Sequence, residues 1–207
     1  MKFTEDDFTV VTQVMRWRRD TRHFLTEPLP PDILARILST VDMAPSVGNA
    51  RPWRIVRVRD TDRRAAVASL FERANRAAAQ EYEPETRADY LRLKLAGLRD
   101  APEHLAVFTV PDPVEGRGLG RQTMPETVQY STAMAVHTIW LAARALNVGV
   151  GWVSILDPVA AATALDVPGH WRLTAYLCLG WPERDDDRPL LDRTGWQPNT
   201  PTEILDR

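Results

Sequence analysis

The sequence predicts an α+β fold in which helices surround one central sheet. Helix-like and strand-like segments follow one another without the strict βα alternation of a doubly wound parallel fold. The length of 207 residues suits one domain, with or without a terminal arm, and allows a sizeable core. Apolar residues make up 44% of the chain and charged residues 26%, which is the balance of an ordinary globular protein.

The N-terminal half is predicted to be mainly helical. Thr4 can cap a first helix, with Asp7 at its third position, and this helix ends near a cluster of arginines. Prolines at 28, 30 and 31 then break the chain. Further helices are expected at 32–43, 62–82 and 86–99, and strands at 54–59 and 104–110. The helix at 86–99 is basic, which indicates either a solvated face or a lid over an anionic ligand.

The C-terminal half contains one unusually apolar helix, predicted at 125–146. Because it is apolar nearly all round, it must be buried in a core or against a partner chain. Strands at 150–156 and 171–181 and a short helix at 158–165 follow. From residue 182 onward there is no periodicity. We therefore expect a domain at 1–181 and an extended arm at 182–207, either disordered or wrapped around a partner.

Charge and composition narrow the classes of function. The net charge is −2 and the pI about 6.1, so neither nucleic acid nor an anionic membrane is an expected partner. Cys178 lies in an apolar run and is interpreted as a buried, inert thiol. The histidines have no metal-ligand spacing, so no metal is expected, and His137 is interpreted as a core residue. With no run of membrane-spanning length, the expected location is the cytoplasm.

Several common catalytic and nucleotide-binding motifs are absent from the sequence. The glycines at 149–151 precede a strand rather than a helix and lack the third glycine of a dinucleotide-binding turn. The glycines at 116–120 have the wrong spacing for that turn. Ser154 is not part of a G-x-S-x-G elbow, which argues against a serine hydrolase.

The most informative segment is a cluster of arginines at the end of the first helix. Arg18, Arg19 and Arg22 fall within five residues, with Asp20 among them. Guanidinium groups are always charged and bind phosphate bidentately, so the cluster suits a phosphorylated ligand. Taken alone, the cluster is also compatible with a solvated helix end.

Together with two other segments, the cluster resembles the flavin-binding signature of the nitroreductase family. The second segment is the Pro-Ser-x-x-Asn loop at 45–53, and the third is the glycine-rich segment at 149–154. The resemblance implies a mostly antiparallel sheet flanked by helices, bound FMN and a homodimer whose C-terminal arms are exchanged. The implied cofactor-binding residues are Arg18, Arg19, Arg22, Pro45, Ser46, Gly48, Asn49, Gly151 and Trp152.

Within the family, the sequence resembles the branch that consumes its flavin, the 5,6-dimethylbenzimidazole synthases. The motifs that carry this likeness lie at 18–22, 44–48, 93–95, 140–145 and 148–155. The resemblance implies that reduced FMN and O₂ yield dimethylbenzimidazole and a four-carbon sugar phosphate. Asp20 is the implied proton-transfer residue and Ser154 an implied hydrogen-bond donor to the flavin. The plainer interpretation of Asp20 is an ion pair with Arg18 or Arg22.

Two other functions stay open at this point. One is an NAD(P)H-dependent nitroreductase or enone reductase that recycles FMN, and the other is a flavin-binding protein without turnover. Arg51 and Gln197 depart from the pattern of the synthases, so Arg51 either adds a flavin contact or blocks the site. Electrons from NAD(P)H, through a separate flavin reductase, are a further expectation.

Overall fold

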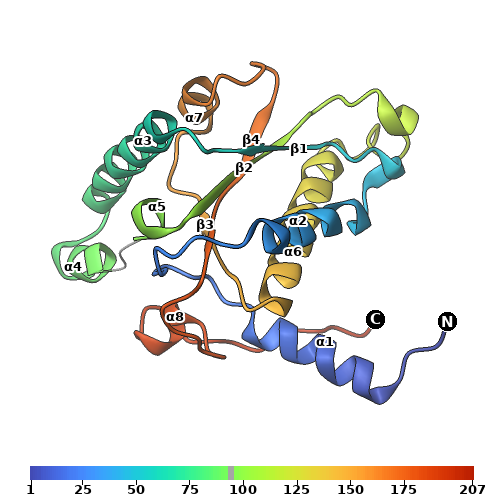
Figure 1. Ribbon diagram of the computed structural model, residues 1–207, viewed down its shortest axis with the longest axis horizontal. Coiled ribbons are helices and arrows are strands. Elements are labelled where there is room, and N and C mark those ends of the chain that lie inside the picture. The colour runs from blue at the N-terminus through green and yellow to red at the C-terminus, as the bar shows by residue number, and fades with distance from the viewer. Residues whose placement is uncertain (93–95) are drawn as a thin grey trace.

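A computed structural model describes residues 1–92 and 96–207 and has a four-stranded antiparallel sheet at its centre (Figure 1). The strands are β1 (Trp53–Arg57), β2 (Glu103–Thr109), β3 (Gly149–Val153) and β4 (Arg172–Gly180), in the spatial order β1-β2-β4-β3. All three pairings are antiparallel, which confirms the predicted α+β class and the antiparallel sheet. Strand β3 lies at one edge of the sheet and follows the long apolar helix in the chain. The candidate site described below lies beside this edge.

Helices cover both faces of the sheet. On one side lie α2 (Pro31–Ser39) and α6 (Thr127–Ala145), and on the other α3 (Thr61–Gln80), α5 (Gly97–Asp100) and α7 (Pro158–Ala164) (Figure 1). Successive strand residues alternate between these two cores: Leu105 packs with the first group and Ala106 with the second. Because both faces are covered, β2 and β4 are apolar almost throughout instead of alternating with polar residues.

The remaining elements follow the local signals in the sequence. Thr4 and Asp7 form the predicted capping box at the start of α1 (Glu5–Trp17), and Asp157 caps α7. The predicted helix at 86–99 is divided into α4 (Pro84–Arg92) and α5, and the predicted motif at 93–95 lies outside the described residues. Three short 3-10 turns, η1 (Thr40–Met43), η2 (Val47–Asn49) and η3 (Glu115–Gly118), complete this part of the fold.

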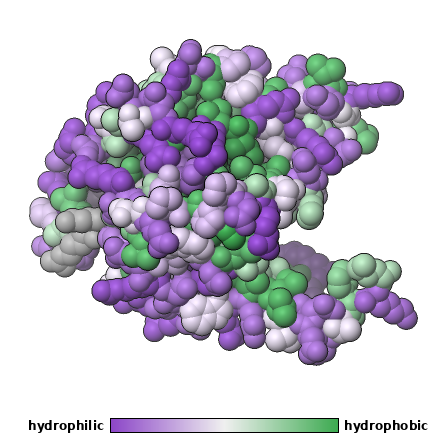
Figure 2. Space-filling view, in the orientation of Figure 1, coloured by the Kyte–Doolittle hydropathy of each residue, from purple (hydrophilic) through white to green (hydrophobic). Residues whose placement is uncertain are grey.

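Helix α6 buries one face in the core and leaves another face uncovered by its own chain. Tyr130 and His137 are exposed, so the interpretation of His137 as a core residue was wrong. Helix α1 has no buried residue at all, and its apolar side chain Phe8 is 63% exposed. In Figure 2 the surface is hollowed on the side where α1 projects away from α2 and α6. The monomer therefore exposes apolar side chains on both α1 and α6.

The segment after residue 182 contains structure that the sequence did not predict. It includes the short helix α8 (Leu190–Arg193), and the ring of Trp196 packs 5.8 Å from Tyr82 and 6.4 Å from Tyr90 of the same chain. The residues beyond Trp196 are exposed. Of the described residues, no helix is long and apolar enough to cross a membrane, and no cluster of His, Cys, Asp or Glu is arranged to hold a metal ion.

A neutral histidine lies in the centre of the sheet. Nδ1 of His104 lies 2.9 Å from the Tyr176 hydroxyl, and both side chains are buried. Burial, and secondarily the charge of Arg64, lowers the pKa of His104 from 6.5 to about 4. Burial also raises the pKa of the nearby Cys178 thiol well above its usual range, which confirms the buried, inert cysteine.

We predict that His104 makes the protein less stable in mild acid. The unfolded chain takes up the proton near pH 6.5 and the folded chain only near pH 4, so stability is lost as the pH falls between these values. The expected loss is about 2.5 kcal/mol between pH 7.5 and 4.5. Urea denaturation at both values checks it, with His104→Gln expected to flatten the dependence. An equal slope in His104→Gln and the parent would contradict the assignment.

Candidate active site

The arginine cluster lies along the edge of the sheet. After α1 the chain runs beside β3, where Asp20 and Val150 form a parallel bridge and the Thr21 N–H donates to the Val150 carbonyl at 3.0 Å. Farther along, Phe24 bridges to Pro182 and anchors the segment in the second core. This short pairing satisfies part of the open edge of β3 and fixes the direction in which the arginines leave the sheet.

The glycines of β3 make this pairing possible. A Cβ built on Gly151 would lie 2.3 Å from the Thr21 carbonyl oxygen, and one on Gly149 would lie 2.7 Å from the Thr21 hydroxyl. Real side-chain carbons do not approach other atoms so closely, so both positions require glycine. The structure thus gives Gly151 a packing role, whereas its predicted contact with a flavin stays a prediction.

Asp20 is fixed between the sheet edge and the arginines. Its Oδ1 accepts a hydrogen bond from the Trp152 N–H at 3.0 Å, and its Oδ2 lies 3.3 Å from Nε of Arg22. Burial raises the pKa of the Asp20 carboxyl above its ordinary value, although the Trp152 N–H and the charges of Arg22 and Arg18 oppose that rise. The ion pair with Arg22 therefore exists, but burial outweighs its effect on the pKa of the Asp20 carboxyl.

A cleft of about 390 Å³ opens beside this segment. Its walls come from the segment after α1, the C-terminal end of α6, the start of β3 and the chain after β4. Basic side chains outnumber acidic ones in the lining. The arginines of the lining are Arg18, Arg19, Arg22, Arg144, Arg184, Arg188 and Arg193. The tryptophans Trp17 and Trp140 supply apolar surface. The volume and lining fit an aromatic ligand that carries a phosphate, as FMN does.

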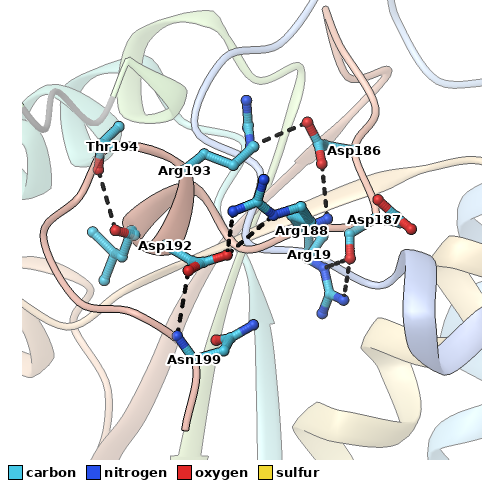
Figure 3. A network of polar contacts seen from close by, with 9 residues as sticks. Arg19, Asp186, Asp187, Arg188, Asp192, Arg193, Thr194 and Asn199 are labelled. Carbon is cyan, nitrogen blue, oxygen red and sulfur yellow. Dashed lines mark hydrogen bonds and ion pairs between the residues drawn. The ribbon is translucent and has the colours of Figure 1, made fainter.

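The chain after β4 reaches across the arginines (Figure 3). Arg19 donates from Nε and Nη2 to the carbonyl of Asp187, at 3.1 and 2.5 Å. Arg144 pairs with Asp185 at 2.6 Å, and Arg193 pairs with Asp186 at 3.1 Å. Several of the cleft arginines thus already have an acceptor, and residues 183–193 form one wall of the cleft.

The predicted loop at 45–53 lies elsewhere. The Val47 N–H donates to the hydroxyl of Ser131 in the first half of α6, at 3.0 Å, whereas Arg144 in the last turn of α6 lines the cleft. At 1.5 Å per residue, these two points of α6 are about 20 Å apart. Gly48 and Asn49 both have positive φ, at 56° and 54°, so this turn has an unusual backbone shape. Pro45, Ser46, Gly48 and Asn49 are therefore not brought to the arginine cleft of their own chain.

The other sequence-predicted positions outside the cleft lining are Gly151, Trp152 and Ser154. Ser154 is exposed, just past the end of β3, while Trp152 contributes its backbone N–H to Asp20. Arg51 lies 3.4 Å from a carboxylate oxygen of Asp42, so its side chain is directed toward η1. Arg144, Arg188 and Trp140 are cleft residues that sequence reasoning did not select. The motif at 140–145 was the signal that could have found two of them.

The fold and the position of the arginines agree with the comparison to known families. The model of the nitroreductase family matches residues 15–181, from the end of α1 to the end of β4. The chain belongs to the nitroreductase family.

More detailed similarity is found to individual proteins of that family. The chain is 52% identical to a 5,6-dimethylbenzimidazole synthase of Rhodobacter capsulatus, in an alignment that covers 98% of each chain. It is also 52% identical to a 5,6-dimethylbenzimidazole synthase of Rhodospirillum rubrum, over 94% of this chain and 92% of that protein. The chain is thus an enzyme of the oxidoreductase type that uses flavin, as the sequence predicted.

The similarity extends to solved structures. A crystal structure of iodotyrosine deiodinase bound to FMN and 3-iodo-L-tyrosine has a TM-score of 0.74, with 21% identity, and covers 95% of this chain and 97% of that one. A nitroreductase-like protein of Bacillus cereus has a TM-score of 0.66 and 17% identity, over 100% of this chain and 99% of that one. At these identities the likeness confirms the fold.

We predict that Gly151→Ala damages the arginine segment, because the new methyl group meets the Thr21 carbonyl. The expected cost is about 1–3 kcal/mol of stability, together with weaker flavin binding as residues 18–22 shift. Gly169→Ala is the matched control, since nothing lies within 4 Å of a Cβ there. Urea denaturation and flavin titration of both variants check the prediction. If Gly151→Ala behaves like Gly169→Ala in both measurements, the close approach is not what fixes the cluster.

Proposed function

We propose that the protein converts reduced FMN and O₂ into 5,6-dimethylbenzimidazole, the lower ligand of vitamin B12, and a four-carbon sugar phosphate. Relatives that share about half of the residues over nearly the whole chain carry the name of this synthase. The observation that carries the proposal is Asp20, a carboxyl with a raised pKa at the base of a cleft rich in arginine.

The arginines bind the phosphate end of the substrate. Arg18, Arg19 and Arg22 enter the cleft from one short segment, and fork-shaped guanidinium groups match the oxygens of a phosphate. A terminal phosphate dianion, as in FMN, fits this wall better than a neutral riboflavin. In this proposal NAD(P)H supplies the electrons through a separate flavin reductase.

Asp20 supplies proton transfer. The substrate FMN brings the electrons that activate O₂, and it is also the molecule whose ring and side-chain carbons are cleaved. The Trp152 N–H fixes the orientation of Oδ1, which leaves Oδ2, at the longer contact with Arg22, as the atom that takes and returns a proton. The Asp20 side chain keeps 35% of its surface exposed, so the carboxyl is accessible from the cleft. Ser154, at the end of β3, donates a hydrogen bond to the flavin in this proposal.

The active site is completed by a second copy of the chain. The arginine cleft and the loop at 45–49 lie about 20 Å apart along α6, so one flavin contacts both only if they come from different chains. The exposed apolar residues of α1 and α6, among them Phe8, Val11, Tyr130 and Met134, supply the contact surface. Exchange of arms is proposed only for the exposed residues 200–207, because Trp196 packs on its own chain.

We predict that Asp20→Asn keeps FMN binding and loses chemistry. Removing a negative charge beside the phosphate site cannot weaken binding electrostatically, but it removes a proton-transfer group that contributes typically 10²–10⁴ in rate. FMN affinity and dimethylbenzimidazole formation are measured with reduced FMN and O₂, by fluorescence and mass spectrometry. Asp166→Asn is the control, since that side chain is 85% exposed and its positive φ of 54° suits Asn.

The outcomes of this experiment separate the candidate functions. If Asp20→Asn forms dimethylbenzimidazole at the parent rate, Asp20 is only an ion-pair partner. If the parent makes no dimethylbenzimidazole but reduces nitro compounds with NAD(P)H, the chain is a reductase that recycles FMN. Binding without either reaction would make it a flavin-binding protein.

We predict that two inactive variants restore one site in a mixed dimer. Arg18→Ala removes a cation of the cleft, and Asn49→Gly removes the loop amide while keeping the positive φ. A mixed dimer then has one site with both defects and one with neither. Affinity-tagged mixed dimers should bind one FMN per dimer at parent affinity, whereas each parental variant dimer binds weakly. If each flavin were held within one chain, no site would be restored.

A further inference from the structure

Trp140 of α6 contacts several parts of the arginine cleft at once. The guanidinium carbon of Arg18 lies 4.7 Å from the centre of its ring. Its indole N–H donates to the carbonyl of Arg19 at 3.3 Å. Its ring also packs 6.3 Å from that of Trp152, whose backbone N–H donates to Asp20. One side chain therefore connects the phosphate-binding arginines to the strand that orients the proposed proton-transfer residue.

Arg18 differs from its neighbours in what it contacts. Arg19 donates to the Asp187 carbonyl, Arg144 pairs with Asp185, and Arg22 pairs with Asp20. For the Arg18 guanidinium, by contrast, the part of the chain described by the structure provides the face of Trp140 and no carboxylate or carbonyl acceptor at bonding distance. Arg18 is half-buried in the cleft lining. Its donors are consequently available for a ligand.

The indole face contacts this cation without using its hydrogen-bond donors. A guanidinium that stacks on an aromatic ring uses its flat face, so its N–H groups, which lie in the plane, stay free. Burial lowers the pKa of Arg18 from its usual value, which reflects partial dehydration of the charge. Such a group has less water to lose on meeting an anion, and its contact with a phosphate is stronger than that of an exposed arginine.

We propose that Trp140 is a positioning residue that makes the cleft specific for flavins with a phosphate group. The indole holds Arg18 by stacking and fixes the backbone of Arg19 by its N–H, and both arginines then meet the phosphate oxygens. The inference rests on the proposed function, in which FMN is the substrate. It adds that discrimination between FMN and riboflavin depends on a side chain that does not itself bind the phosphate.

The test compares FMN with riboflavin in three variants. Trp140→Leu loses both the ring face and the N–H, and Trp140→Phe keeps a ring but loses the N–H. Trp171→Leu is the control, because Trp171 packs against Phe108 in the other core. In Trp140→Leu the affinity for FMN is expected to fall roughly tenfold, while that for riboflavin changes less than twofold. The FMN affinity of Trp140→Phe is expected to lie between those of Trp140→Leu and the parent. The control Trp171→Leu is expected to keep the parent's ratio of FMN affinity to riboflavin affinity.

A double-mutant cycle separates positioning from general stability. In an Arg18→Gln background, Trp140→Leu should cause a smaller further loss of the preference for FMN than in the parent, because one of the two arginines that it positions is gone. Equal weakening of FMN and riboflavin by Trp140→Leu, or full additivity with Arg18→Gln, would overturn the proposal. If the parent protein prefers FMN but forms no dimethylbenzimidazole, the proposed reaction alone is overturned. A parent protein without preference for FMN would overturn both.

Discussion

The close approach of residues 20–22 to strand β3 is the constraint on which the site depends. The Thr21 carbonyl occupies the space where any side chain at position 151 would begin. This contact places Thr21 in hydrogen-bonding reach of Val150 and brings the Asp20 carboxylate to the Trp152 N–H. Because α1 ends only a few residues earlier, the same contact sets where Arg18 and Arg19 leave the helix. In the proposed function, phosphate binding and proton transfer thus depend on one backbone pairing.

A cluster of like charges must be offset when no ligand is present, and the chain after β4 provides the offset. Carboxylates of Asp185 and Asp186 and the carbonyl of Asp187 contact three of the arginines, while Arg18 is stabilised by the face of an indole. Exposed ion pairs of this kind contribute little stability each. Their effect is to order the guanidinium groups before a ligand arrives, which reduces the entropy lost on binding.

The sequence predicted the fold class, the strands and the cap at Thr4 because these follow from local periodicity and capping chemistry. It also predicted the arginine cluster and Asp20, since both lie in one short segment. It failed where the outcome depends on contacts between distant segments. The contacts of Arg144 with Asp185 and of Trp196 with Tyr82 join residues far apart in the chain. The exposure of His137 was missed because an apolar helix does not reveal which of its faces the monomer covers.

The same limit explains why the sequence does not say whether the loop at 45–49 and the arginines of one site come from the same chain. Motif order along a chain does not say whether two motifs meet within that chain or across a twofold axis. Helix α1 suggests a physical reason for the second arrangement. It has 13 residues and buries none of them, and helices so short are marginal without packing. On the proposed dimer, a partner covers Phe8 and Val11 and stabilises the helix whose end carries Arg18. Assembly would then form the phosphate site as well as complete it, so that an isolated chain lacks both the loop and a well-ordered arginine cluster.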